Sequence, residues 1–182
     1  MEDENNLEEL IKKSQKHDEL AFSKLIHSIE NQMYRVAKLK LGKDEDAYEA
    51  IQNTIILIYK NIKKLKEPKK FKTWAIRILI NECLKIIKKN KKSINSFIEY
   101  DDKIGKIENR FEKVESEVDL NNLLKLLNED EKIVISLYFG EQYKIREISE
   151  ILSESEGTIK SRISRAKIKI KNYMEEKNYG QC

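Results

Sequence analysis

The chain has 182 residues with a net charge of +4, of which 37% are charged and 40% hydrophobic, and it contains one proline and five glycines. This composition favours helix over strand, and no apolar run approaches the roughly 20 residues that a membrane span needs. The acidic start MEDENNLEEL is unlike a signal peptide, and the distant Cys83 and Cys182 give no disulfide framework and no metal-binding spacing, so we expect a cytoplasmic protein without a cofactor.

Apolar periodicity and helix breakers predict helices along most of the chain. Residues 7–40 are expected to form two helices, and Pro68 is expected to separate the third helix from the fourth. Weak periodicity and mixed charge at 93–119 indicate a linker. The helices expected after residue 40 cover 46–65, 72–89, 120–127, 130–138, 144–152 and 156–175. No strand pattern emerges, so the sequence predicts an all-α protein with two small helical domains joined by a linker.

The predicted helix at 46–65 has one apolar and one mixed face. Successive steps of about 100° per residue place five side chains inward: Ile51, Ile55, Ile58, Tyr59 and Ile62. The outward side carries Glu49, Gln52, Asn53, Ile56 and Lys60. Ile56 lies among polar groups, which is a common arrangement at a protein interface. The alternative is that this outward face of the helix only contacts solvent.

The predicted helix at 72–89 places the only tryptophan, Trp74, on its cationic face. That face also carries Arg77, Asn81, Lys85 and Lys88, while the opposite, inward side carries Ile76, Leu79, Ile80, Cys83, Leu84 and Ile87. An exposed aromatic ring beside a basic track can hold single-stranded bases, with stacking worth about 1–3 kcal/mol per base. We therefore expect this face to capture a melted DNA strand. The alternative is that Trp74 packs against Phe71 and the preceding loop.

Charge is distributed unevenly along the chain. Residues 60–92 contain 13 basic and 2 acidic residues, whereas 93–119 contain 4 basic and 8 acidic ones. A second basic stretch, SESEGTIKSRISRAKIKIKN at 153–172, holds six Lys and Arg residues. Two basic blocks separated by an acidic one indicate two modules that bind a polyanion. The alternative for either block alone is a solvated helix face.

The last two predicted helices form a helix-turn-helix, in which Ser153 and Glu154 make the turn and Ser155 is a good N-cap. The inward stripe of the final helix is Ile159, Ile163, Ala166 and Ile170. Opposite lie Ser161, Ser164, Arg165 and Ile168, with Lys160, Arg162, Lys167 and Lys169 on the flanks. Such a helix suits the major groove, where an arginine can bond two acceptors of guanine. The alternative is an ordinary helical hairpin.

The stretch EGTIKSRISRAKIKIK resembles the second helix of region 4 in bacterial sigma-70-family factors, and the preceding LNEDEKIVISLYFGEQYKIREISEIL resembles the first half of that region. Ser153 and Glu154 stand where the family usually has glycine and an apolar residue. The resemblance implies binding of the −35 promoter element and contact with the β flap of RNA polymerase. The residues implied in −35 binding are Thr158, Lys160, Ser161, Arg162, Ser164, Arg165 and Lys169.

The stretch FKTWAIRILINECLKIIKKNKK resembles regions 2.3 and 2.4 of extracytoplasmic-function sigma factors, which bind and melt the −10 element. It departs from the family at two positions. Lys85 stands where an aspartate is common, and Ile86 stands where an aromatic residue is common. The residues implied in strand capture are Phe71, Trp74, Arg77 and Asn81, and the same helix face adds Lys85 and Lys88. DAYEAIQNTIILIYKNI is similar to region 2.2, which docks on the β′ clamp helices, although Tyr48 and Asn53 stand where acids are usual. The residues implied in polymerase binding are Asp46, Glu49, Gln52, Asn53 and Ile56.

The two resemblances occur in family order, with nothing between them long enough to be region 3, which is typical of the extracytoplasmic-function group. They imply region 2 at 1–92, a linker at 93–119 and region 4 at 120–178. The implied function is that of a dissociable sigma factor, which directs RNA polymerase to promoter DNA and initiates transcription. An inhibitory anti-sigma factor is implied as a further partner, and no small-molecule substrate is expected.

Other classes of function stay open at this point. The sequence has no HExxH, CxxC or P-loop, and His17 and His27 lie far from either cysteine, so neither a catalytic nor a metal site is predicted. An autonomous helix-turn-helix regulator would usually dimerise and would leave the Trp74 face unexplained. An adaptor or anti-sigma-type protein would bind polymerase without reading DNA.

Overall fold

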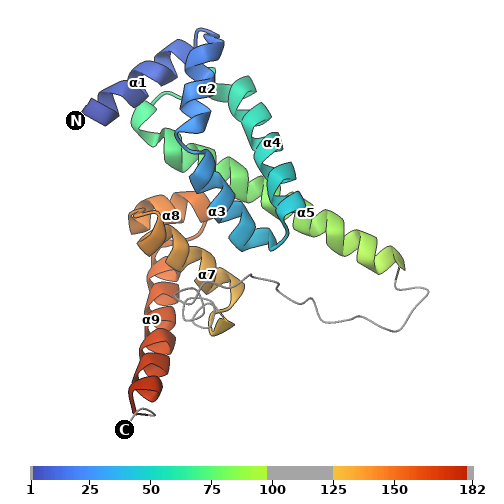
Figure 1. The fold of residues 1–182 in the computed structure, drawn as a ribbon, viewed down its shortest axis with the longest axis vertical. Helices are drawn as coiled ribbons and strands as arrows, with labels where there is room; N and C mark the ends of the chain where they lie inside the picture. Colours follow the sequence, from blue (N-terminus) through green and yellow to red (C-terminus); the bar gives the residue numbers. More distant parts are fainter. Residues whose placement is uncertain (1, 98–124, 180–182) are drawn as a thin grey trace. The chain divides into compact units, whose positions relative to one another are not determined.

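The computed structural model describes residues 2–97 and 125–179, and within these ranges all regular elements are helices. The chain forms two compact units, Met1–Asp102 and Lys103–Cys182 (Figure 1). The all-α architecture predicted from the sequence is thereby confirmed. Among the described residues, no helix is both long enough and apolar enough to cross a membrane.

The first unit begins with three helices, α1 (Glu2–Ser14), α2 (Glu19–His27) and α3 (Glu30–Leu41), so the prediction of two helices over residues 7–40 is wrong. The chain turns between α1 and α2 at His17, whose φ of 66° is left-handed. Asp18 then caps α2 by accepting a hydrogen bond from the N–H of Ala21 at 2.9 Å. Because these breaks are only a few residues long, the apolar periodicity runs across them and conceals them.

Helix α4 (Asp44–Asn61) packs against α3 and α5 (Phe71–Phe97), and two 3₁₀ turns, η1 (Ile62–Lys64) and η2 (Pro68–Lys70), connect α4 to α5. The buried side of α4 consists of Ala47, Ala50, Thr54 and Ile58. Ile51 and Ile55, predicted to face inward, are only partly buried, and Tyr59 is exposed. The buried face is therefore rotated from the predicted one, toward the small side chains of Ala47, Ala50 and Thr54.

Helix α5 supplies much of the first core, with Phe71, Ala75, Ile76, Leu79, Ile80, Cys83 and Ile86 buried. Leu84, predicted to face inward, is 40% exposed, and Ile86 is buried instead. Burial raises the pKa of the Cys83 thiol to about 12, which makes it an unreactive core residue. Helix α5 continues past Lys92, so 93–97 are helical instead of belonging to a linker. The rest of the predicted linker, 98–119, lies outside the described residues.

The second unit contains α7 (Glu129–Ile135), the π-helical turn η3 (Ser136–Gly140), α8 (Ile145–Leu152) and α9 (Glu156–Tyr179). These elements begin at or next to the starts predicted for the helices at 130–138, 144–152 and 156–175. The predicted helix at 120–127 lies mostly outside the described residues. Helix α9 packs against both α7 and α8. Their shared core is formed by Ile133, Val134, Leu137, Ile148, Ile151, Ile159, Ile163 and Ala166.

Candidate nucleic-acid interface

Helices α8 and α9 are joined by a tight turn. Ser153 ends α8 with a left-handed backbone, at φ 56° and ψ 42°, and the N–H of Glu154 donates to the Ser149 carbonyl at 3.1 Å. The Ser155 hydroxyl accepts a hydrogen bond from the N–H of Thr158 at 3.1 Å, which confirms its predicted role as N-cap. The arrangement is a helix-turn-helix, as the sequence predicts.

Replacing Ser153 with glycine is expected to stabilise the second unit by about 0.5–1 kcal/mol. A left-handed backbone costs a residue with a Cβ atom roughly 1–2 kcal/mol, and the greater freedom of glycine in the unfolded chain offsets part of the gain. Hydrogen exchange of the α8 and α9 amides in the full chain measures the change. Ser153→Ala is the control, because alanine keeps the Cβ atom; a neutral glycine variant would contradict the strain at this turn.

The outer surface of α9 carries polar and cationic side chains. The exposed residues are Lys160, Ser161, Ser164, Arg165, Lys167 and Ile168, and Thr158 is partly exposed. On the other side Ile159, Ile163 and Ala166 are buried, as the helical periodicity predicts, whereas Ile170, the fourth residue of the predicted stripe, is only partly buried. Serine hydroxyls and a guanidinium can reach base edges, while lysines at the rim can meet phosphates.

Four of the predicted −35 residues make ion pairs within the unit, and those of Arg162 and Lys169 are shorter than those of Lys160 with Glu156 and Arg165 with Glu131, at 3.8 and 3.9 Å. The Arg162 side chain is only 15% exposed, and its guanidinium lies 2.6 Å from Glu154 and 3.2 Å from Asp130. The Lys169 ammonium lies 2.7 Å from the buried carboxylate of Glu131. Carboxylates from α7 and the turn thus bind both of these flanking cations, and Arg162 is the more enclosed of the two, since the Lys169 side chain is 41% exposed.

Glu131 is a structural residue that the sequence reasoning missed. Its carboxylate accepts a hydrogen bond from the N–H of Asn128 at 3.0 Å, while its own N–H donates to the Asn128 side chain at 2.8 Å. Burial by itself raises the pKa of Glu131. Hydrogen bonds from Lys169 and Asn128 lower it, as do the charges of Lys169 and Arg165. These effects outweigh burial, so the pKa of Glu131 lies below its usual value. The Asn-x-x-Glu spacing before an apolar run is the signal for this capping box.

The first unit presents a cationic face on α5. Four of its predicted residues are exposed: Arg77, Asn81, Lys85 and Lys88. Trp74 is partly exposed, and its ring centre lies 6.3 Å from that of Phe71. Phe71 itself is fully buried, so its assignment to strand capture is corrected. One side of the indole thus rests on the core, as the alternative interpretation expects, while the rest stays accessible beside the cations.

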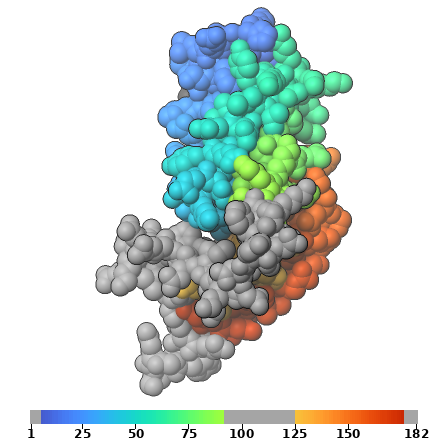
Figure 2. Space-filling model, turned by 90° about the vertical axis from the view of Figure 1, so that its right-hand side faces the viewer, coloured from blue at the N-terminus to red at the C-terminus, as the bar shows by residue number. Residues whose placement is uncertain are grey.

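The predicted polymerase-binding residues lie along α4. All five are exposed or partly exposed: Asp46, Glu49, Gln52, Asn53 and Ile56. Two of them also interact with α5, since Asp46 accepts a hydrogen bond from Asn90 at 3.1 Å and Glu49 pairs with Lys89 at 3.2 Å. The start of α4, in cyan, therefore lies beside the yellow-green part of α5 on the surface of this unit (Figure 2).

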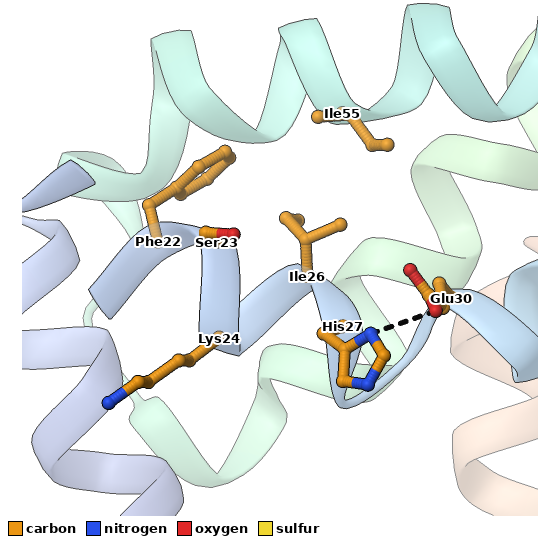
Figure 3. Close-up of a pocket in the computed structure, with 7 residues that line it drawn as sticks. All are labelled: Phe22, Ser23, Lys24, Ile26, His27, Glu30 and Ile55. Atoms are coloured by element: carbon orange, nitrogen blue, oxygen red, sulfur yellow. Dashed lines mark ion pairs between the residues drawn. The ribbon is translucent and has the colours of Figure 1, made fainter. Parts of the chain in front are cut away.

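An open pocket lies between α2 and α4 (Figure 3). Its lining residues are Phe22, Ser23, Lys24, Ile26, His27, Glu30 and Ile55. The His27 Nδ1 atom lies 2.9 Å from the Glu30 carboxylate. None of the predicted site residues lines this pocket, and the described part of the chain contains no group of three or more His, Cys, Asp or Glu residues placed to hold a metal. The candidate site is thus a set of helical faces.

The chain matches known families in two stretches. Residues 25–93 match the family described as Sigma-70 region 2, and residues 117–170 match Sigma-70, region 4. The ECF RNA polymerase sigma factor SigM of Mycobacterium tuberculosis is 24% identical over 163 residues, covering 90% of this chain and 82% of that protein. RNA polymerase sigma factor SigV of Bacillus subtilis is 29% identical over 133 residues, covering 73% of this chain and 78% of that protein.

Two solved structures share the fold. The sigma factor RpoE of Bartonella quintana, solved with the anti-sigma factor NepR, has a TM-score of 0.68 at 19% identity and covers 85% of this chain and 96% of its own. CnrH, solved with the cytosolic domain of CnrY, has a TM-score of 0.66 at 17% identity and covers 94% of this chain and 98% of its own. With both sigma-70 regions matched in order, the chain belongs to the sigma-70 family of RNA polymerase sigma factors, in its extracytoplasmic-function group.

Proposed function

We propose that this chain directs bacterial RNA polymerase to specific promoters by binding the −35 element as duplex through its second unit and capturing the −10 strand through its first. The observation that carries this proposal is the occurrence, in one chain, of an accessible helix-turn-helix surface and a tryptophan-bearing cationic face. The chain would act in the cytoplasm as an initiation subunit with no catalysis of its own.

Exposed and partly exposed residues of α9 are assigned to the −35 element: Thr158, Lys160, Ser161, Ser164 and Arg165. Lysine–phosphate contacts fix the register of the helix on DNA without reading sequence. Base reading then depends on the short polar side chains and on Arg165, whose exposed guanidinium suits the two major-groove acceptors of guanine.

The exposed face of α5 is assigned to the −10 strand. Trp74 would stack on an unpaired base, and the polar residues that follow it would track the backbone: Arg77, Asn81, Lys85 and Lys88. Lys85 pairs with Glu82 at 2.6 Å but keeps most of its side chain exposed, so a phosphate can approach it. Stacking and charge together offset the cost of unstacking the duplex.

Ile56 is assigned to the centre of the polymerase contact, beside Gln52 and Asn53. Its side chain is 50% exposed among polar neighbours, which is typical of an interface residue. Ile56→Asp is expected to weaken binding to core polymerase by at least about tenfold, because it places a charge in a desolvated contact. Titration of labelled full-length chain with core polymerase, followed by fluorescence anisotropy, measures this affinity.

Leu84→Asp is the matched control for that substitution. Leu84 is 40% exposed on α5 and belongs to no proposed polymerase contact, so its variant is expected to bind core polymerase like the wild type. An Ile56→Asp protein that binds with wild-type affinity would remove this residue from the contact. Equal losses in both variants would point to a general effect of the added charge.

An anti-sigma factor is proposed as a further partner. The two solved structures of the same fold are complexes, one with the anti-sigma factor NepR and one with the cytosolic domain of CnrY. Crosslinking of the tagged full chain in its own cells tests this partner. Capture of a protein whose removal raises promoter-specific transcription is the expected result, and capture of polymerase subunits alone would count against it.

Transcription by purified core polymerase from a mixed promoter library, with and without the chain, tests the proposed function. Promoter-specific transcripts that require the chain are expected. If no such transcripts appear and the chain alone binds duplex DNA as a dimer, it is an autonomous regulator instead. If it binds polymerase but selects no promoter, it is an adaptor.

A further inference from the structure

Arg162 connects three parts of the second unit. It belongs to α9, its Nη1 atom lies 2.6 Å from a carboxylate oxygen of Glu154 in the turn, and its Nη2 atom lies 3.2 Å from Asp130 in α7. Only 15% of its side chain is exposed. A single guanidinium thus connects the candidate recognition helix to both the turn and helix α7.

The turn between α8 and α9 contains a strained residue and a charged one. Ser153 adopts a left-handed backbone without the conformational freedom of glycine. Glu154 follows it, and only 32% of its side chain is exposed. Hydrogen bonds between a guanidinium and a carboxylate are charge-assisted, and partial burial protects this pair from the screening that weakens exposed pairs. The ion pair of Glu154 and Arg162 therefore ties the turn directly to α9.

Arg165 lies on the next turn of α9 and has a different environment. Its side chain is 60% exposed, and its guanidinium approaches Glu131 no closer than 3.9 Å. Reading guanine requires donors that can turn toward the major groove. Arg165 meets this requirement as it stands, whereas Arg162 would first have to release two carboxylates.

We propose that Arg162 is a positioning residue: through Glu154 and Asp130 it fixes the angle of α9 on the turn and on α7, and it does not read the −35 sequence. The inference rests on the proposed function and deepens it, because it separates the guanidinium that orients the helix from the one that contacts bases. A well-packed apolar pair can replace an ion pair of this kind without loss.

Four full-length proteins are compared with core polymerase on a promoter library randomised across the −35 element: wild type, Arg162→Met, Glu154→Leu/Arg162→Met and Arg165→Met. Arg162→Met is expected to lower initiation about tenfold on all sequences alike, since it leaves carboxylates unpaired at the turn. The double variant is expected to recover to within about threefold of wild type, with the same base preference. Arg165→Met, the matched control, is expected to lose about 5- to 150-fold of discrimination at one position.

A changed base preference at a single position in either Arg162 variant would overturn the positioning role, as would a double variant no more active than Arg162→Met. An Arg162→Met protein with wild-type activity would overturn it too. Absence of promoter-specific transcripts with the wild type would instead refute the proposed function. In that case each of the four proteins selects bound duplexes from the same library, without polymerase. The base preferences of the four proteins are expected to differ in the same way as above. If no protein enriches any sequence, both proposals are overturned.

Discussion

Replacing Trp74 with alanine is expected to slow open-complex formation by about 10- to 100-fold while leaving the affinity for core polymerase unchanged, since stacking contributes about 1–3 kcal/mol per base. The indole is partly exposed at the start of the cationic face of α5, where it can receive a base as the duplex opens. Stopped-flow fluorescence of a base analogue placed in the −10 element of a promoter selected by the chain measures the opening rate.

Two comparisons separate stacking from a loss of structure. Trp74→Phe keeps an aromatic face and the contact with Phe71, so it is expected to retain most of the opening rate. A template with a mismatched, already open −10 element is expected to restore initiation by Trp74→Ala, because unstacking no longer limits the reaction. If Trp74→Ala opens the duplex at the wild-type rate, or fails equally on the open template, strand capture by this residue is refuted.

Replacing Glu131 with glutamine is expected to lower the free energy of unfolding of the second unit by about 1.5–3 kcal/mol at neutral pH, the range for hydrogen bonds to charged groups. The buried carboxylate completes a capping box with Asn128 and pairs with Lys169 at 2.7 Å. Denaturation of the full chain, followed by hydrogen exchange of the α7 and α9 amides, measures the loss. Glu129→Gln is the matched control, because Glu129 is exposed and pairs with Lys132 on the surface, and no measurable change is expected.

The loss of stability in Glu131→Gln is expected to depend on pH. The pKa of Glu131 is lower in the folded protein than in the unfolded chain, so its carboxylate contributes its full stabilisation above the unfolded pKa. This stabilisation is lost as the pH falls through the lowered folded pKa. The difference between wild type and Glu131→Gln is therefore expected to be greatest at neutral pH and to shrink in acid below the ordinary glutamate range. A difference independent of pH would assign the effect to packing.

The helix-turn-helix could be predicted because its signals are local. The role of Ser155 as N-cap and the buried stripe of Ile159, Ile163 and Ala166 depend only on neighbours within a few residues, and the structure has them as expected. The exposed side of α5 likewise follows from the periodicity of one helix. Local periodicity decides such faces because each helix has a single apolar side to bury.

The errors lie where burial depends on partners that are distant in sequence. Arg162 pairs with Asp130, which is 32 residues away, and Lys169 pairs with Glu131, which is 38 residues away. The periodicity of one helix places such cations on a polar flank and cannot show what faces them. Phe71 is the first residue of α5, where the preceding turn η2 sets the direction of the side chain. The pattern of the following helix did not predict its burial.

The most direct test of the account asks whether each unit recognises its own promoter element. Core polymerase and the full chain initiate on a library randomised across both elements, and the promoters that they use are sequenced. We predict two separate blocks of preferred sequence. Arg165→Met is expected to change only the upstream block, and Trp74→Ala is expected to reduce initiation without changing that block. A single preferred block, or transcripts that do not depend on the chain, would contradict promoter recognition by two helical units.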